Sequence, residues 1–472
     1  MPAKHGLHTT ISRHKARLTS ELTKARLRRG QPTLEALRDH VNAGSLGAAS
    51  NGSGYVHPRW IRVNTLLTSL SEELKTTFTD YMEVSDLSRI TYPQGAKDKV
   101  IYMDENIPGL VAVPGTQDLS NSTAYKQGRL IFQEKASCFP AYLLDAESIQ
   151  GDIVDACAAP GNKTTHLAAI VHASRPPPSD DRRRKIFACE KDAARSETLA
   201  KMIKLAGASD IVQVRAKQDF MKLDPNAPQF AKVEALLLDP SCSGSGIVGR
   251  DEAKVIVHLP SRDGGKQPEA TRGKKRKRGQ QSAQATPVRL DTVIEADPSA
   301  EETAPTTAGS EDESKLAFRL ANLSSFQLRL LERAMAFPAA KRITYSTCSL
   351  HKEENEYVVA RALLSDVARE RGWRVLRRRE QVEGMKRWDL RGSQEAVKEV
   401  LGDGDVEDVA QACIRCEKGG EGGTMGFFVV AFVRDAIERE TESVKTSDVV
   451  SNGHAESDGD EDEWEGFSDS EG

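Results

Sequence analysis

Short apolar runs that stop abruptly at small or polar residues alternate with segments of helical periodicity along the chain. Such runs are typical of strands buried on both faces, and this alternation predicts an α/β fold with a doubly wound, mostly parallel, Rossmann-like sheet. We expect strands at residues 153–157, 185–190, 211–215, 235–239, 342–345, 373–376 and 426–433. We expect helices near residues 164–171, 193–205, 324–336 and 353–362. Ligands bind at the carboxyl ends of strands in such sheets, so the residues that follow the runs are candidate site residues.

Two of these runs lead into a cysteine. Cys242 follows LLLDPS, in which Asp239 ends the apolar run, and Cys348 follows RITYST. A thiol beside a carboxylate at the ligand-binding edge of a sheet indicates a nucleophile with acid–base help. Each cysteine taken alone favours the interpretation as a buried structural thiol.

A third segment, DACAAPGNKTTHLA from residue 155 onward, predicts a strand end, a tight turn of small residues and the start of a helix. Small residues let a ligand approach the backbone, and free amides at a helix N-terminus can hold a carboxylate. The segment lacks both common phosphate-binding glycine patterns. The next strand ends in Glu190, where a carboxylate can accept hydrogen bonds from ribose hydroxyls. A ligand with a ribose and a carboxylate but no phosphate fits S-adenosylmethionine.

Together, DACAAPGNKTTHLA, LLLDPSCSGSG and YSTCSL resemble the Fmu/Sun, or nucleolar proliferation-antigen, family of RNA cytosine carbon-5 methyltransferases. The form DPSCSGSG is most similar to the eukaryotic subgroup that modifies 25S/28S ribosomal RNA. PRWIRVNTL, QEKAS and EENE agree with this, and the resemblance runs from about residue 58 to about residue 433. It implies S-adenosylmethionine-dependent methylation of carbon 5 of a cytosine in RNA. The usual release motif of the family is Asp-Ala-Pro-Cys, so the form here bears on the substrate subclass more than on activity.

The resemblance also implies roles for the catalytic residues. Cys348 is the nucleophile that adds to carbon 6 of the cytosine, and Cys242 helps to release the product. Asp239 contacts N3 and the exocyclic amine and lies near the methionine end of the cofactor. Lys163 orients the base or lowers the pKa of a thiol, as a neighbouring cation does.

The same resemblance assigns the cofactor site. Glu190 binds the ribose, Asp219 approaches the adenine amine, and Arg195 matches a cofactor-site position in the most similar subgroup. A surface ion pair is the alternative for Arg195. The methionine portion is held by the loop after the first strand, which consists of Cys157, Ala158, Ala159, Pro160, Gly161, Asn162 and Lys163. We expect Cys157 itself, like Cys189, to be a packing residue and not a reactive thiol.

Composition changes divide the chain into four expected parts. Residues 1–54 are a basic helical region with a linker, and 55–125 resemble the small N-terminal α/β RNA-binding subdomain of the family. Residues 126–433 are the methyltransferase domain, and 434–472 are an acidic, disordered tail. Residues 260–314 are expected to be a disordered insertion, and their basic run at 274–278 is a candidate nuclear-localisation or nucleic-acid patch.

The formal net charge of −4 conceals an uneven distribution. Residues 454–472 hold nine acids and no Lys or Arg, and removing them leaves a formal charge of +5. The first 50 residues hold nine Lys or Arg and three acids, which fits a nucleic-acid partner and equally a solvated charged helix. We expect phosphate contacts from Arg26, Arg28, Arg29 and the segment Arg59–Arg62.

Seven cysteines in 472 residues are too few for a disulfide framework and favour a reducing compartment. Cys413 and Cys416 form a Cys-x-x-Cys pair without two further ligands at suitable spacing, so we expect no metal. The longest apolar run, residues 425–433, is too short to span a bilayer.

These features predict a monomeric enzyme of the nucleus that acts in the nucleolus. Its expected partner is RNA, most simply ribosomal RNA of a pre-60S particle. No membrane association is expected. Two alternatives remain open at this point. One is the same chemistry on transfer RNA, and the other is a ribosome-assembly factor whose RNA binding matters more than turnover.

Overall fold

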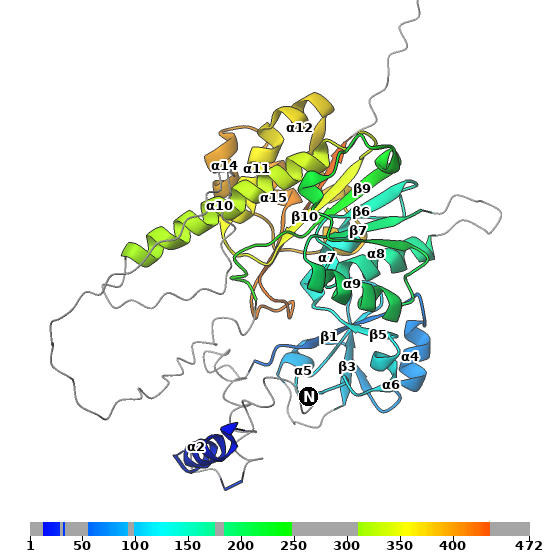
Figure 1. Cartoon of the computed structure of the whole chain (residues 1–472), viewed down its shortest axis with the longest axis vertical. Coiled ribbons are helices and arrows are strands. Elements are labelled where there is room, and N and C mark those ends of the chain that lie inside the picture. The colour runs from blue at the N-terminus through cyan, green and yellow to red at the C-terminus, as the bar shows by residue number, and fades with distance from the viewer. Residues whose placement is uncertain are drawn as a thin grey trace, which may run out of the picture. The chain divides into compact units, whose positions relative to one another are not determined.

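An eight-stranded sheet forms the centre of the larger part of the molecule (Figure 1). The computed structural model describes residues 13–28, 32–33, 55–92, 99–174, 184–247 and 310–434. The strand order is β11-β13-β10-β9-β6-β7-β8, and β12 pairs with β13. Strands β10, β9, β6, β7 and β8 are parallel, whereas β13 is antiparallel to both of its neighbours β10 and β11. The expected Rossmann-like, doubly wound and mostly parallel sheet is therefore confirmed.

The elements of this part follow one another along the chain as strands with intervening helices. The strands are β6 (Asp152–Asp155), β7 (Ile186–Glu190), β8 (Val212–Ala216), β9 (Val233–Leu238), β10 (Arg342–Thr347), β11 (Trp373–Val375), β12 (Ile414–Cys416) and β13 (Phe427–Arg434). The helices are α7 (Lys135–Leu143), α8 (Asn162–Ala173), α9 (Ala193–Leu205), α10 (Ser310–Met335), α11 (Glu356–Leu364), α12 (Asp366–Arg371), α13 (Glu383–Lys386), α14 (Gln394–Leu401) and α15 (Val406–Ala412).

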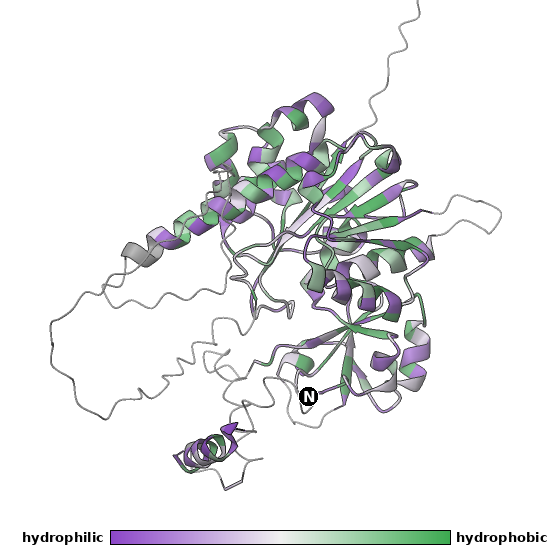
Figure 2. Ribbon diagram, viewed as in Figure 1, coloured by the Kyte–Doolittle hydropathy of each residue, from purple (hydrophilic) through white to green (hydrophobic). Residues whose placement is uncertain are grey.

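Both faces of the sheet are buried, because successive side chains of each strand point to opposite faces. In β9, Leu236 and Leu238 pack in one core with residues of α10 and α11, whereas Ala235 and Leu237 pack in another with α8 and α9. Figure 2 shows the central strands mostly in the hydrophobic colour, while α10 carries both colours. Strands buried on both faces need apolar residues at nearly every position, which explains the continuous runs in the sequence.

A smaller sheet precedes this part, in the order β2-β3-β4-β1-β5. Strand β5 pairs with β1, so this sheet runs past residue 125, where the sequence suggested the boundary. Its elements are β1 (Arg59–Val63), α4 (Leu70–Thr76), β2 (Met82–Val84), α5 (Ser88–Thr91), β3 (Val100–Met103), β4 (Leu110–Val113), α6 (Thr123–Lys126) and β5 (Leu130–Phe132).

The two sheets share a core at their junction. Ile61 and Val63 of β1 pack within the smaller sheet's own core, whereas Trp60 packs in a core that also contains Phe139 of α7 and Val429 of β13. The indole Nε1 of Trp60 donates a hydrogen bond to the carbonyl oxygen of Gly423 over 2.7 Å. The alternate residues of β1 therefore face the methyltransferase part.

Two regions differ from the expectations. Helix α10 begins at Ser310, inside the segment 260–314 that the composition marked as disordered, because its polar first turns continue into the amphipathic pattern that follows. Between β11 and β13 the chain forms α13, α14, α15 and β12, which the sequence did not indicate.

The predicted N-terminal helix is described over α2 (Lys15–Arg28), where Leu18, Leu22 and Leu27 are exposed. The linker at 43–54, the basic run at 274–278, Arg29 and the acidic tail lie outside the described residues. Within the described ranges no helix combines the length and the apolar character that crossing a membrane requires.

Candidate active site

The two cysteines meet at the carboxyl edge of the sheet, because β9 and β10 are adjacent parallel strands with Leu238 opposite Tyr345. The chain then leaves β9 through Asp239 toward Cys242, and it leaves β10 directly at Cys348. The Sγ atoms of Cys242 and Cys348 lie 3.0 Å apart, and both side chains are partly buried.

The pKa values of the two cysteine thiols are shifted in opposite directions. The hydrogen bond from Cys242 lowers the pKa of Cys348 below its usual value, against the opposing effects of burial and of Asp239, and the cation of Lys163 adds to the lowering. The same hydrogen bond, with burial, raises the pKa of Cys242. This asymmetry favours ionisation of Cys348 over that of Cys242.

Asp239 is held by two neighbours. Its Oδ2 lies 2.7 Å from Nζ of Lys163, and its Oδ1 accepts a hydrogen bond from Oγ of Ser346 over 2.7 Å. Lys163 also donates to Oγ of Ser137 over 3.0 Å, and its ammonium lies 5.6 Å from the ring centroid of Phe427. Burial alone would lower the pKa of Lys163, but the carboxylate of Asp239 outweighs burial and the pKa is raised. The lysine is therefore a fixed cation beside the thiolate.

The turn between β6 and α8 is shaped for close approach of a ligand. Asp155 at the end of β6 is buried and accepts hydrogen bonds from Oγ1 of Thr164 over 2.7 Å and from the amide of Cys157 over 3.3 Å. Gly161 precedes α8 with a φ of 117°, which favours glycine, and no side chain caps the helix. The predicted loop residues thus form one turn, with Ala158, Ala159 and Gly161 buried, Pro160 exposed, and Cys157, Asn162 and Lys163 partly buried.

The predicted ribose and adenine residues lie at the ends of the next two strands. Glu190, 4% exposed, ends β7 and accepts a hydrogen bond from the amide of Asp192 over 2.9 Å. Arg195 lies 3.5 Å from Glu190 and donates to the carbonyl of Ala159 over 2.9 Å, so it links the acid to the turn. Asp219 follows β8 and accepts from the amide of Met221 over 3.0 Å. A buried carboxylate, a turn with free helix amides and a second carboxylate fit S-adenosylmethionine.

A buried acid and a buried amide join the loops that carry the two cysteines. Glu354 accepts hydrogen bonds from the amide of Ser243 and from Nε2 of Gln327, each over 3.0 Å. Asn355 accepts from Oγ1 of Thr347 over 2.6 Å and donates to the carbonyl of Ser349 over 2.9 Å. These contacts fix the residues that follow Cys242 and Cys348.

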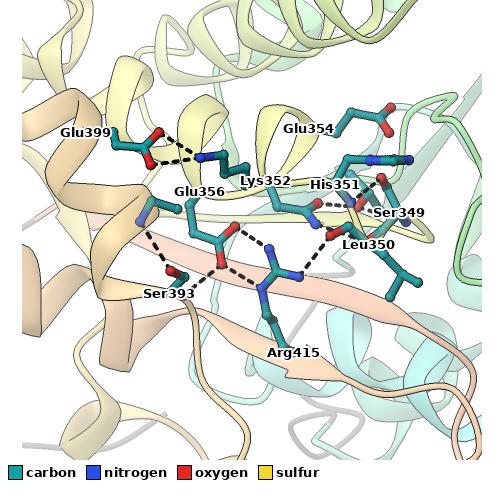
Figure 3. Close-up of polar contacts among 12 residues, drawn as sticks. Ser349, Leu350, His351, Lys352, Glu354, Glu356, Ser393, Glu399 and Arg415 are labelled. Carbon is teal, nitrogen blue, oxygen red and sulfur yellow. Dashed lines mark hydrogen bonds and ion pairs between the residues drawn. The ribbon is translucent and has the colours of Figure 1, made fainter. Parts of the chain in front are cut away.

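Figure 3 shows the polar layer behind the Cys348 loop. Arg415 of β12 forms an ion pair with the buried Glu356 and donates to the carbonyl of Leu350 over 3.2 Å. Lys352 contacts both carboxylate oxygens of Glu399, each over 2.8 Å. The segment between β11 and β13 therefore supports the loop.

The structure thus brings Cys348, Cys242, Asp239 and Lys163 together, and it groups Glu190 and Arg195 with the turn before α8. Sequence reasoning did not single out the residues that hold these groups. They are Ser137, Asp155, Ser346 and Glu354. The available signal was position, since Asp155 and Ser346 stand at strand ends, and Ser137 and Glu354 lie in the motifs QEKAS and EENE.

One expected phosphate contact is wrong. Arg62 is 2% exposed, because its position in β1 faces the methyltransferase part and not solvent. Arg59, in the same strand, is partly buried with its guanidinium 5.2 Å from the ring centroid of Phe132.

The remaining cysteines have the features of packing residues. Burial raises the pKa of Cys189 to about 12 and also raises the pKa values of Cys157, Cys413 and Cys416. The described part of the chain contains no group of three or more potential metal-ligating side chains.

Known proteins resemble both parts of the chain. Residues 141–260 match the family model described as 16S rRNA methyltransferase RsmB/F. Residues 57–133 match the ferredoxin-like domain of NOL1/NOP2/Sun domain family member 5. A crystal structure of a methyltransferase homolog from Pyrococcus horikoshii shares the fold, with a TM-score of 0.50, 18% identity, and coverage of 88% of this chain and 99% of that one.

Curated relatives are named for one activity. The 25S rRNA (cytosine-C(5))-methyltransferase rcm1 of Schizosaccharomyces pombe is 33% identical over 91% of this chain and 72% of its own length. The mouse 28S rRNA (cytosine-C(5))-methyltransferase is 32% identical over 75% of this chain, and the chain covers 60% of it. The resemblance found in the motifs is confirmed. This chain belongs to the family of rRNA cytosine-C5 methyltransferases that includes rcm1 and NSUN5.

Proposed function

We propose that this protein transfers the methyl group of S-adenosylmethionine to carbon 5 of a cytosine in large-subunit ribosomal RNA. One observation carries the proposal: Sγ of Cys348 lies 3.0 Å from Sγ of Cys242, beside the pair of Asp239 and Lys163, at the carboxyl edge of the sheet. The names of the relatives favour large-subunit ribosomal RNA over transfer RNA. The intact thiol pair favours turnover over a purely structural role in ribosome assembly.

The cofactor site consists of the turn before α8 and the carboxylates at the ends of β7 and β8. Amides of the first turn of α8 bind the carboxylate of the methionine portion, Glu190 binds the ribose, and Asp219 binds the adenine amine. Arg195 orients Glu190 against the turn. S-adenosylmethionine supplies the electrophilic methyl group.

The chemistry begins at Cys348. Carbon 5 of cytosine is a weak nucleophile until a thiolate adds to carbon 6. Cys348 supplies this thiolate because Cys242 donates a hydrogen bond to it and Lys163 lies nearby as a cation. The addition places negative charge on the ring, chiefly at carbon 5, N3 and the carbon-2 oxygen.

Asp239 and Lys163 stabilise this negative charge. Ser346 and Lys163 hold the Asp239 carboxyl in place, so it meets N3 and the exocyclic amine of a cytosine bound over Cys348. A proton delivered to N3 through this pair makes carbon 5 enamine-like.

Cys242 completes the cycle. The carbon-5 proton must leave before the bond from carbon 6 to Cys348 can break. The carbon-5 proton passes to solvent and the N3 proton returns to the Asp239–Lys163 pair, while the electron pair of the broken bond stays on Cys348, which leaves as a thiolate. Cys242, in contact with Cys348, assists by donating a hydrogen bond to the departing sulfur, so both sulfurs regain their starting states.

RNA binding is assigned to the small sheet and the basic N-terminal region, since base chemistry requires the cytosine to leave its stack and the rest of the RNA to be held. The eukaryotic relatives are named for methylation of large-subunit ribosomal RNA, which fits action in the nucleus and its nucleolus. Association with pre-60S particles stays a prediction. The monomeric state stays a prediction.

The proposal is tested by incubating the purified protein with isotopically labelled S-adenosylmethionine and with deproteinised large-subunit ribosomal RNA or transfer RNA. Nucleoside analysis should detect labelled 5-methylcytosine in the ribosomal RNA only, and none with Cys348→Ala. Label found only in transfer RNA would identify transfer RNA, and not ribosomal RNA, as the substrate. Binding of RNA without label in any RNA would favour the assembly role.

A further inference from the structure

Arg62 of β1 reaches from the small sheet into the methyltransferase part. Its Nε donates to Oε1 of Gln133 over 2.8 Å, and its Nη2 donates to Oγ1 of Thr165 over 2.8 Å and to the carbonyl of Asn162 over 3.3 Å. The side chain is 2% exposed. It therefore binds the protein itself and not solvent or phosphate.

The surroundings of this guanidinium contain no counter-ion. Among the described residues no carboxylate lies within ion-pair distance of Arg62, and burial lowers the pKa of Arg62 to about 10. The neighbouring His166 is buried, and burial together with Arg62 lowers its pKa, so it remains neutral. A buried cation without an acid destabilises a fold, and an apolar side chain would fill the space at lower cost. The benefit of this arginine therefore lies in where its donors point.

The guanidinium of Arg62 donates hydrogen bonds to residues of the first turn of α8 on both sides of Lys163. Asn162 precedes Lys163 and Thr165 follows it by two residues, and Oγ1 of Thr165 also donates to the carbonyl of Asn162 over 3.0 Å. The N-cap residue of this helix offers no side chain. Arg62 does not replace that cap, because a guanidinium only donates hydrogen bonds; it instead ties a carbonyl and a hydroxyl of the first turn to the small sheet.

A second route leads from Arg62 to the same lysine. Gln133, which accepts from Arg62, donates its Nε2 to the carbonyl of Ser137 over 3.0 Å. Oγ of Ser137 in turn accepts from Nζ of Lys163. Both the backbone and the ammonium of Lys163 are therefore fixed by groups that Arg62 holds.

We infer that Arg62 is a positioning residue of the active site, which acts through Lys163 on Asp239 and on the thiolate of Cys348. The small sheet then completes the catalytic machinery as well as holding RNA. The inference rests on the proposed function for its meaning, but its first test needs neither RNA nor cofactor.

The test measures the acidity of Cys348. Each variant is alkylated with iodoacetamide across a pH series, and peptide mass spectrometry follows Cys348 separately from Cys242. If Arg62→Met displaces Lys163, the pKa of Cys348 should rise by about half a unit or more, which slows its alkylation at neutral pH about threefold. Arg62→Lys retains a cation with fewer donors and should restore part of the rate.

The matched control is Arg129→Met. Arg129 directly precedes β5 of the same sheet and pairs with the buried Glu73, but among the described residues its side chain has no hydrogen bond or ion pair with α8. Its alkylation profile should match the wild type. On a Lys163→Met background Arg62→Met should add no further shift, because the lysine through which it acts is already absent.

Thr165→Val decides the case if Arg62→Met does not fold. It removes the hydroxyl that joins Arg62 to Asn162 at nearly constant volume, and it should shift the Cys348 profile in the same direction. An unchanged profile in a folded Arg62→Met protein, or in Thr165→Val if the former is unfolded, overturns the inference. If the Cys348 profile of the variants shifts as expected but the wild-type protein methylates no RNA, only the proposed function is refuted.

Discussion

Lys163 and Asp239 form a 2.7 Å ion pair across the carboxyl edge of the sheet, although one begins a helix and the other ends a strand. In the proposed mechanism this one cation acts both on the carboxylate that faces the base and on the cysteine that attacks it. The acidity of Cys348 and the position of Asp239 therefore depend on the same side chain.

Replacing Lys163 should change the pH dependence of catalysis. Lys163→Met removes a cation that lowers the pKa of Cys348, so a smaller fraction of Cys348 is thiolate at neutral pH. The rate of methyl transfer should fall at least about tenfold near pH 7 and recover partly as pH rises. Lys341 forms an ion pair with Glu234 at the opposite edge of the sheet, and its side chain is 54% exposed. Lys341→Met should leave the pH profile of methyl transfer unchanged. A uniform loss at every pH would contradict a role in thiol acidity.

Glu190 should determine cofactor affinity more than turnover. Glu190→Gln keeps the shape but weakens hydrogen bonds to a ribose by about 1.5–3 kcal/mol, which corresponds to roughly 10–100-fold weaker binding. Titration calorimetry with S-adenosylmethionine measures this directly. Glu197→Gln, at an exposed position of α9, the helix that follows Glu190, is the control. Equal affinity in Glu190→Gln and wild type would remove Glu190 from the site.

Asp155 should make stability depend on pH. Burial raises its pKa to about 6 despite the hydrogen bond from Thr164, so the folded protein keeps this proton to higher pH than the unfolded chain. Its contribution is full below about pH 4 and is lost as pH rises to about 6, by up to about 3 kcal/mol. Relative to wild type, Asp155→Asn should gain that much unfolding free energy between pH 4 and pH 7 in urea titrations. Parallel curves for both proteins would show that Asp155 is ionised throughout.

The basic helix α2 offers a test of RNA binding. Substituting Arg26 and Arg28 by Gln should weaken binding to ribosomal RNA, because two phosphate contacts are lost. The slope of log affinity against log salt should become shallower by about 1.4–1.8. Filter binding over a salt series measures the slope, and calorimetry should find cofactor affinity unchanged. An unaltered slope would identify α2 as a solvated helix.

Much of the catalytic centre could be predicted from the sequence because its residues stand directly at strand ends. Asp239 follows the mostly apolar run VEALLL and Cys348 follows RITYST, which is buried although several of its residues are polar, and parallel strands place such ends at one edge. Most of the supporting residues could not be found in this way, because Ser137, Ser346 and Glu354 depend on partners far along the chain. Glu354, for example, accepts from Ser243, 111 positions away.

Arg62 shows the same limit. The strand RWIRV is amphipathic in neither sense, and an arginine at its fourth position suggests solvent. Only the packing of the second sheet determines that this side chain points into the protein and reaches Thr165, 103 positions later. Likewise, α10 extends to Ser310 through residues whose composition alone resembles a disordered linker.

The division of labour between the two thiols is the central claim, and a trapped adduct tests it most directly. Cys242→Ala is incubated with ribosomal RNA and S-adenosylmethionine, resolved on a denaturing gel, and the retarded band is digested for peptide mass spectrometry. The account predicts a covalent protein–RNA complex with the cytosine attached to Cys348, since addition proceeds while elimination fails. The same incubation with Cys348→Ala should yield no retarded band. A retarded band from Cys348→Ala, with the cytosine on Cys242, would contradict the account and reverse the roles of the two thiols.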